Sequence, residues 1–509
     1  MLHAVGIVLV LVVLGTAVAT FAGRWGIPAP SLLVLAGIAV ALVPGAPTVH
    51  VAPDVIALVV LPPLLYASAE EISARDLRRV WAPVLVLALG LVLATAAVVA
   101  SLALALTALS GAMAFVLGAV LASTDPVAVT ALGRRLPLPG RIQVLVQSES
   151  LFNDATSLVL FKVAVVAAAA GSVGVFGAVG KFFVLAGGGI AIGAALAGAV
   201  ALLRSFIDDP VLETVIALVT PYTAYLLAES VDVSGVTAVV VAGIVSGSVA
   251  HRITDAHTRL HLHSVYAVVV FGLESVVFAL IGLQLPTLVR DLGPGDAWWP
   301  LQAAVLAAAL IGVRMAWVWP TTALARPTRS YPTWPLTRVV TWAGTRGVMP
   351  LAAALSIPLL ADDGTPLPGR PLVLVLTTAV VAATLTVQGL SLAGVVKTSG
   401  LAVAPEHAAA KEEAARAAMD QAVVEYLDDL AATGKVNELA VVRLRGRYAE
   451  RLDPDTDAAL LEDLAMLRRD VLSVQAAELR RLFAEEQIGD GLRRRLQAEL
   501  DRREAGLDA

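Results

Sequence analysis

The chain has 509 residues, of which 58% are hydrophobic and only 15% are charged, and its mean hydropathy is +0.82. These values exclude an ordinary soluble globular protein and indicate a chain that crosses a membrane many times. Cysteine is absent, which excludes disulfide bonds and thiolate chemistry. The formal net charge of -5 is small and gives no indication of a nucleic-acid partner.

Apolar runs of about the length of a transmembrane helix, roughly 20 residues, follow one another through the first 400 residues. Thirteen such runs cover residues 2–21, 27–43, 53–68, 80–109, 111–132, 142–170, 175–203, 211–230, 234–250, 264–285, 298–324, 336–360 and 371–396. The first run lacks the basic leading segment and the cleavage site of a signal peptide, so we interpret it as a span. The Pro62–Pro63 pair predicts a kink or a break in the third span.

Loop charges agree with this count if the C-terminus is cytoplasmic and the N-terminus is outside. The loops that are then inside carry Arg24, Arg75, Arg78, Arg79, Arg134, Arg135, Arg141, Arg204, Arg252, Arg259, Arg326, Arg329, Arg338 and Lys397. The outside loops hold only Arg290 and Arg370, next to four aspartates. This asymmetry follows the positive-inside rule. We therefore predict an all-α, multi-pass protein of the cell membrane, surrounded by lipid.

The composition changes after residue 396. Residues 406–509 are rich in Ala, Glu, Arg and Leu with helical periodicity, and Pro454 divides them. We predict a transmembrane domain, 1–400, and a helical cytoplasmic tail, 401–509. A solvated appendage, a dimer contact and a regulatory element all remain open for the tail.

The sixth span carries two carboxylates within residues 148–157, Ser-Glu-Ser-Leu-Phe-Asn-Asp-Ala-Thr-Ser. A carboxylate inside a membrane is costly and usually faces water, a cation or a partner charge. Residues four apart share a helix face, so Glu149 aligns with Asn153, and Ser150 aligns with Asp154. The alternative is a polar seam that only joins helices.

Two further spans are predicted to be interrupted. Asp125 precedes a proline in the middle of the fifth span, which frees backbone carbonyls near Thr124. Asp125 then either caps the half-helix that follows or binds a cation directly. In the twelfth span, two glycines flank Arg346. Interrupted helices in separate halves of a transporter indicate inverted repeats with a binding site near the midplane.

The charges within the spans suggest pairs. We predict that Glu149 pairs with Arg346, which leaves Asp154 free to exchange a proton for a cation. Lys162 is expected to reach the interface or to pair internally. Glu274 and Arg314 are a further possible pair.

Seven short motifs together resemble the monovalent cation/proton antiporters of the bacterial NhaP and eukaryotic sodium/proton exchanger type. They are Leu-Pro-Pro-Leu-Leu-Tyr at 61–66, Ser-Thr-Asp-Pro at 123–126, Glu-Ser-Leu-Phe-Asn-Asp at 149–154, Thr-Pro-Tyr-Thr-Ala-Tyr-Leu-Leu-Ala-Glu at 220–229, Ile-Gly-Leu-Gln-Leu at 281–285, Gly-Thr-Arg-Gly at 344–347 and Val-Gln-Gly-Leu at 387–390. The resemblance covers most of residues 1–400. It implies thirteen helices, inverted repeats and a homodimer. It also implies a dimer part, roughly 1–70 and 211–285, and a moving ion-transporting core, roughly 80–170 and 298–397.

The resemblance also implies roles for individual residues. Asp154 corresponds to the acid that binds the ion or the proton, with Ser150, Thr124 and Asp125 around it. Asn153 corresponds to an amide that accompanies electroneutral exchange. Glu149 and Arg346 correspond to an internal salt bridge.

One departure from the family concerns the third span. Family members often carry an acid immediately after the Leu-Pro-Pro-Leu-Leu-aromatic run, where this chain has Ala67. Glu70 and Glu71 follow, so a carboxylate from the third span is in question, and with it the ion preference.

These observations predict a secondary antiporter that exchanges Na⁺, or K⁺ or Li⁺, for H⁺ without a cofactor, and maintains pH and sodium levels. Hard cations prefer oxygen ligands, which Asp154, Ser150 and the carbonyls near Thr124 supply. A cation channel is the alternative from another class. An intramembrane enzyme is disfavoured because the spans lack a zinc-binding pattern.

Overall fold

In the computed structural model, the described residues are 12–13, 15–18, 20, 29–43, 52–72, 74–125, 138–170, 175–207, 209–253, 256–293, 296–324, 332–361, 364–401, 421–429, 431, 475, 477 and 481. The chain divides into two compact units, Met1–Val403 and Ala404–Ala509. Most of the first predicted span, residues 126–132 of the fifth and most of the tail lie outside the described residues.

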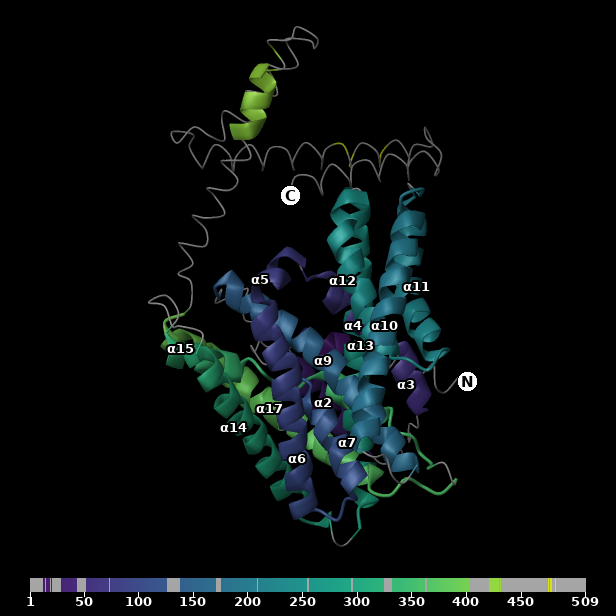
Figure 1. The fold of residues 1–509 in the computed structure, drawn as a ribbon, viewed down its shortest axis with the longest axis vertical. Coiled ribbons are helices and arrows are strands. Elements are labelled where there is room, and N and C mark those ends of the chain that lie inside the picture. Colours follow the sequence, from purple (N-terminus) through teal and green to yellow (C-terminus); the bar gives the residue numbers. More distant parts are fainter. Residues whose placement is uncertain are drawn as a thin grey trace. The chain divides into compact units, whose positions relative to one another are not determined.

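The first unit is built from helices, as the apolar runs predict (Figure 1). In chain order they are α2 (Ala29–Ala41), α3 (Pro53–Val59), α4 (Leu61–Glu70), α5 (Ala74–Leu85), η1 (Val86–Leu91), α6 (Val92–Leu106), α7 (Gly111–Ala122), α9 (Gly140–Ala170), α10 (Val175–Arg204), α11 (Pro210–Glu229), α12 (Gly235–Ile253), α13 (Ala256–Arg290), α14 (Trp299–Leu324), α15 (Thr333–Trp342), α16 (Val348–Leu355) and α17 (Arg370–Ser399). The all-α, multi-pass fold is therefore confirmed.

Among the described residues, seven helices are long and apolar enough to cross a membrane, and shorter apolar helices accompany them. This number does not decide the predicted count of thirteen. The third span is divided at Val60, between α3 and α4, as the proline pair predicts. Both prolines lie in the first turn of α4, where their missing N–H groups cost no helical hydrogen bond.

Two glycines allow helices α2 and α13 to approach each other closely. A Cβ on Gly37 of α2 would lie 2.3 Å from the carbonyl oxygen of Ala279 in α13. A Cβ on Gly282 of α13 would lie 2.1 Å from the carbonyl oxygen of Val34 in α2. The two helices therefore meet backbone to backbone, which is how small residues allow helices to associate where lipid surrounds them.

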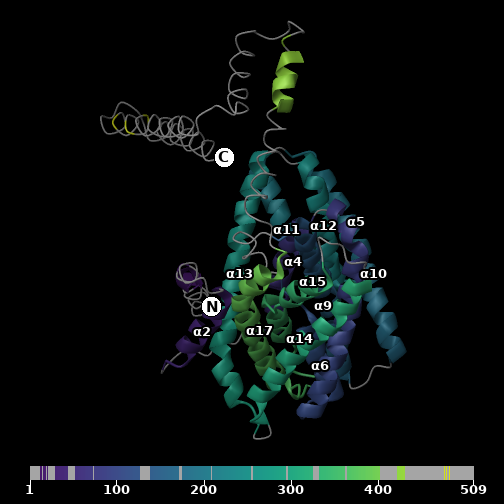
Figure 2. The same cartoon turned by 90° about the vertical axis from the view of Figure 1, so that its left-hand side faces the viewer.

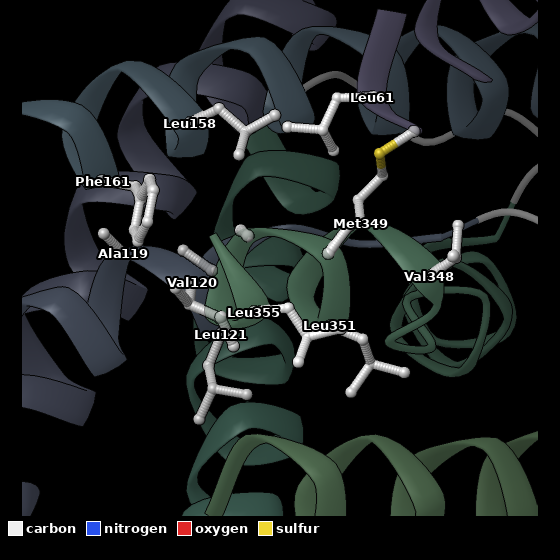
Figure 3. Close-up of a cluster of buried hydrophobic side chains, with 14 of the residues drawn as sticks. Leu61, Ala119, Val120, Leu121, Leu158, Phe161, Val348, Met349, Leu351 and Leu355 are labelled. Carbon is white, nitrogen blue, oxygen red and sulfur yellow. The ribbon is translucent and has the colours of Figure 1, made fainter. Parts of the chain in front are cut away.

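Helix α9, which carries the two predicted carboxylates, packs against α5, α7, α10 and α12. Figure 1 shows it among these helices, and Figure 2 shows the same helices turned by 90°. One buried apolar cluster joins Leu158 and Phe161 of α9 to Leu61 of α4, Leu121 of α7 and Met349 of α16 (Figure 3). This packing fixes α9 next to the two interrupted spans.

Candidate ion-exchange site

The two interrupted spans meet at Asp125 and Thr345. The backbone N–H of Asp125 donates to the carbonyl oxygen of Thr345 at 2.8 Å, and Thr345 Oγ1 donates to the carbonyl oxygen of Asp125 at 2.7 Å. The helix of one span ends at Ala122, and that of the other is open between Trp342 and Val348. The peptide groups freed by each interruption thus satisfy each other, which permits non-helical backbone in a buried position.

Asp125 lies at the positive end of a helix of the other span. Its Oδ2 accepts a hydrogen bond from the backbone N–H of Val348, the first residue of α16, at 3.3 Å. A Cβ on Gly347 would lie 1.5 Å from this oxygen, so only glycine fits there. The sequence predicts that Asp125 either caps the half-helix that follows it in its own span or binds a cation. The contact described is with α16, and residues 126–137 lie outside the described part of the chain, so both alternatives stay predictions.

Arg346 lies at the negative ends of helices. Its Nε donates to the carbonyl oxygen of Leu121 at 2.8 Å, and its guanidinium donates to that of Gly344 at 2.9 Å. These carbonyls belong to the last turn of α7 and to the residues just after α15. A helix carries partial negative charge at its C-terminus and partial positive charge at its N-terminus. Arg346 and Asp125 therefore neutralise helix ends of opposite charge where the two interrupted spans meet, which we call the crossing.

The predicted ion-binding residues gather beside this crossing. Asp154 accepts a hydrogen bond from the hydroxyl of Ser123, and Ser150 donates to the carbonyl oxygen of Thr124. Asn153 Nδ2 donates to Thr124 Oγ1 at 3.1 Å. The sequence does not predict Ser123 as a site residue, although the 123–126 motif contains it.

One acceptor in this group has no partner within the described part of the chain. Asn153 is 1% exposed, and no described residue donates a hydrogen bond to its Oδ1. A buried unpaired acceptor carries a desolvation cost that a bound cation or water would relieve. Asp154 itself is 7% exposed. The arrangement therefore gathers a carboxylate, an amide oxygen, hydroxyls and a backbone carbonyl, which are the ligands that hard cations prefer.

The prediction that Glu149 pairs with Arg346 is wrong, because another arginine is its partner. Glu149 pairs with Arg314 of α14 in a two-pronged contact, with N–O distances of 2.5 and 2.8 Å and side-chain exposures of 1% and 3%. Arg314 Nε also donates to the carbonyl oxygen of Val340 at 3.0 Å. The Arg314 guanidinium lies close to the backbone of Gly344, and a Cβ on Gly344 would lie 2.4 Å from Arg314 Nε. The suggested Glu274–Arg314 pair is replaced by the same contact.

Two further ion pairs join helices elsewhere in the described part of the chain. Arg204 and Glu213 make a buried ion pair at 2.9 Å, and Lys162 pairs internally, as expected, with a carboxylate of α11. Among the described residues, Asp125 and Arg346 are the main charges near Asp154, whereas Arg204, Glu71 and His263 are the main charges near Glu70. Glu70 therefore belongs to a different cluster from Asp154.

Comparisons with known proteins also indicate a cation/proton antiporter. The family described as "Sodium/hydrogen exchanger, transmembrane" matches residues 8–398. An uncharacterized Na⁺/H⁺ exchanger of Mycobacterium tuberculosis is 36% identical, over 98% of this chain and 96% of its own length. A sodium, potassium, lithium and rubidium/H⁺ antiporter of Bacillus pumilus is 31% identical, over 70% of this chain and 56% of its own length.

The fold is similar to that of a solved antiporter. The structure of the sodium/proton antiporter MjNhaP1 from Methanocaldococcus jannaschii at pH 8 matches with a TM-score of 0.66 at 20% identity. The match covers 78% of this chain and 99% of that chain. The family match spans the helices that form the crossing and the whole of α9. This chain belongs to the sodium/hydrogen exchanger family of multi-pass membrane proteins.

Proposed function

We propose that this protein exchanges Na⁺ for H⁺ across the cell membrane, with Asp154 holding either the proton or the cation. The observation that carries the proposal is the buried Asp154 beside the crossing; on the preceding residue, Asn153 Oδ1 has no hydrogen-bond donor among the described residues. The relatives support Na⁺ as the first cation to test. K⁺ and Li⁺ are the alternatives, because the Bacillus relative is named for both.

Burial of Asp154 explains why exchange would be coupled. An ionised carboxylate without a partner is costly in a low-dielectric interior, whereas a protonated one is neutral and a Na⁺-bound one is compensated. The site therefore changes sides readily when occupied and poorly when empty. Since a proton and a cation compete for one group, loading one ion releases the other.

The proposal assigns a cation ligand set to residues linked through the 123–124 stretch. Ser123 is hydrogen-bonded to Asp154, and Ser150 and Asn153 are hydrogen-bonded to Thr124. We assign Ser150 Oγ, the carbonyl oxygen of Thr124 and Asn153 Oδ1 as ligands in addition to the Asp154 carboxylate. In the cation-bound state, the Ser123 hydroxyl keeps one carboxylate oxygen oriented and leaves the other to the ion. Asp125 is held at the start of α16 and stays a structural charge.

Exchange of one Na⁺ for one H⁺ follows from the neighbour of Asp154. Asn153 is an amide and adds no second titrating charge, so the transported charge balances. The proposal also includes a location in the cell membrane, with the N-terminus outside and the tail in the cytoplasm. It further includes a homodimer and a role in sodium and pH balance. The loop charges and the family support them.

The test is a pH-dye assay in proteoliposomes with Na⁺, K⁺ and Li⁺ gradients at a clamped voltage. We expect Na⁺-driven proton flux that is independent of voltage, and no flux in Asp154→Asn. Flux in Asp154→Asn as fast as in the wild type would refute the role of Asp154. Cation flux without proton movement would support a channel instead.

A further inference from the structure

An ion pair joins α9 to the turn between α11 and α12, away from Asp154. Lys162 Nζ lies 2.6 Å from Glu229 Oε2 and donates to the carbonyl oxygen of Val233 at 3.4 Å. Glu229 Oε1 accepts a hydrogen bond from the backbone N–H of Gly235 at 3.1 Å. One carboxylate thus links the end of α11 to the start of α12, and one lysine joins both to α9.

The α11–α12 turn is a firm support for this contact. The backbone N–H of Ser234 donates to the carbonyl oxygen of Leu185 in α10 at 3.1 Å. A Cβ on Gly188 of α10 would lie 2.4 Å from Val233 Cγ1, so the turn and α10 are in close contact. The partner of Lys162 is therefore anchored to α10, α11 and α12 together.

The hydrogen bonds around Asp154 come from other elements. Among the described residues, they link α9 to the stretch after α7, and that stretch to the opening between α15 and α16. None of these bonds comes from α10, α11 or α12. The family resemblance puts α11 and α12 in the stationary dimer part. On that division, if Asp154 faces each side in turn with these bonds intact, α9 has to move relative to the α11–α12 turn.

We propose that Lys162 and Glu229 are positioning residues of the exchange cycle: their ion pair holds α9 in the position seen here and opens each time Asp154 changes sides. Lys162 lies eight residues beyond Asp154 on the same helix, about 12 Å away, so it acts on the helix and not on the ion. This inference rests on the proposed exchange function. It assigns Lys162 an effect on the maximal rate and none on the intrinsic affinity of the site for the cation.

The expected size of the effect follows from exposure. The Lys162 and Glu229 side chains are 35% and 32% exposed, and Glu229 is the last residue of α11, so we treat the pair as one at the membrane surface, where water weakens the attraction. Loss of such a pair changes an equilibrium by about two- to fivefold. Lys162→Met should lower the population in the position seen here by this factor and alter the maximal exchange rate, while the apparent KM for Na⁺ changes by no more than the same factor.

The population can be measured directly because the chain has no native cysteine. Spin labels on Val166→Cys in α9 and Val231→Cys in the turn report the distance between the two elements. We expect Lys162→Met and Glu229→Gln to shift the distance distribution alike, the double variant to shift it no further, and Lys162→Arg to retain the wild-type distribution. The charge swap Lys162→Glu with Glu229→Lys should restore it in part. Lys181→Met, an exposed lysine of α10, is the matched control.

Three results would overturn the inference: an unchanged distance distribution in Lys162→Met, additive effects in the double variant, or a large increase in the KM for Na⁺. Thermal unfolding of each variant in detergent identifies loss of folding. The distance measurement needs no transport, so a wild-type protein that fails to exchange ions refutes the proposed function separately.

Discussion

The buried Glu149–Arg314 pair allows a sharp test of the arrangement around the crossing. Both side chains are at most 3% exposed, and two N–O contacts join them. Arg314→Met leaves the Glu149 carboxylate buried without a counter-charge, and Glu149→Met leaves the guanidinium in the same state. Removing one partner of such a pair costs about 3–5 kcal/mol of folding free energy.

The double variant should behave differently. With both residues replaced by Met, no buried charge remains, and apolar replacement of a buried pair is close to neutral. The two single losses therefore should not add, and their coupling should be about 3 kcal/mol or more. The free energy of unfolding from SDS titration of the four proteins measures this coupling.

Arg346 provides the matched comparison. The sequence predicts it as the partner of Glu149, whereas its guanidinium donates to the carbonyls of Leu121 and Gly344. Arg346→Met should therefore destabilise the protein whether or not Glu149 is present. Strong coupling of Glu149→Met with Arg346→Met, and weak coupling with Arg314→Met, would refute the pairing described here.

Further predictions concern the crossing, helix packing and the ion ligands. Gly347→Ala places a Cβ 1.5 Å from Asp125 Oδ2, so the carboxylate has to move, and Na⁺-driven proton flux should fall about tenfold or more; wild-type flux would contradict this. Gly282→Ala should lower the free energy of unfolding by about 1–3 kcal/mol without changing the KM for Na⁺. Gly312→Ala, which meets no atom within 4 Å, is the control for both. Asn153→Asp adds a second carboxylate, so exchange should become voltage-dependent under clamped voltage. Because H⁺ and Na⁺ compete for Asp154, the apparent KM for Na⁺ should rise by up to about tenfold for each unit of falling pH once protonation dominates; a KM that stays constant from pH 9 to pH 6 would argue against a shared site.

The sequence predicts the helical, membrane-spanning fold because its signals are local. A run of about 20 apolar residues has to form a helix in lipid to satisfy its own peptide groups. Proline next to Asp125, and glycines around Arg346, likewise predict interruptions from steric rules that act within a few residues. The sequence predicts helix boundaries less accurately. Helix α5 begins at Ala74, before the predicted run 80–109, and α13 begins at Ala256, before the predicted run 264–285.

The charge pairs could not be deduced in the same way. Residues four apart on α9 predict that Ser150 and Asp154 share a face, but no spacing along a chain says which arginine of another helix faces Glu149. That choice depends on the crossing of α9, α14 and α15, and on a gap that the missing side chain of Gly344 leaves for Arg314. Asp125 shows the same limit, because its contact with α16 comes from the other interrupted span.

The sequence by itself determined the class of protein, the interruptions and the acid-rich motif on α9, since hydrophobicity and backbone sterics are properties of short segments. The tertiary structure alone decided the partners: Ser123 with Asp154, Arg314 with Glu149, and Lys162 with Glu229. Ion pairs and hydrogen bonds need atoms within a few ångströms of each other, and only the packing of distant helices sets those distances.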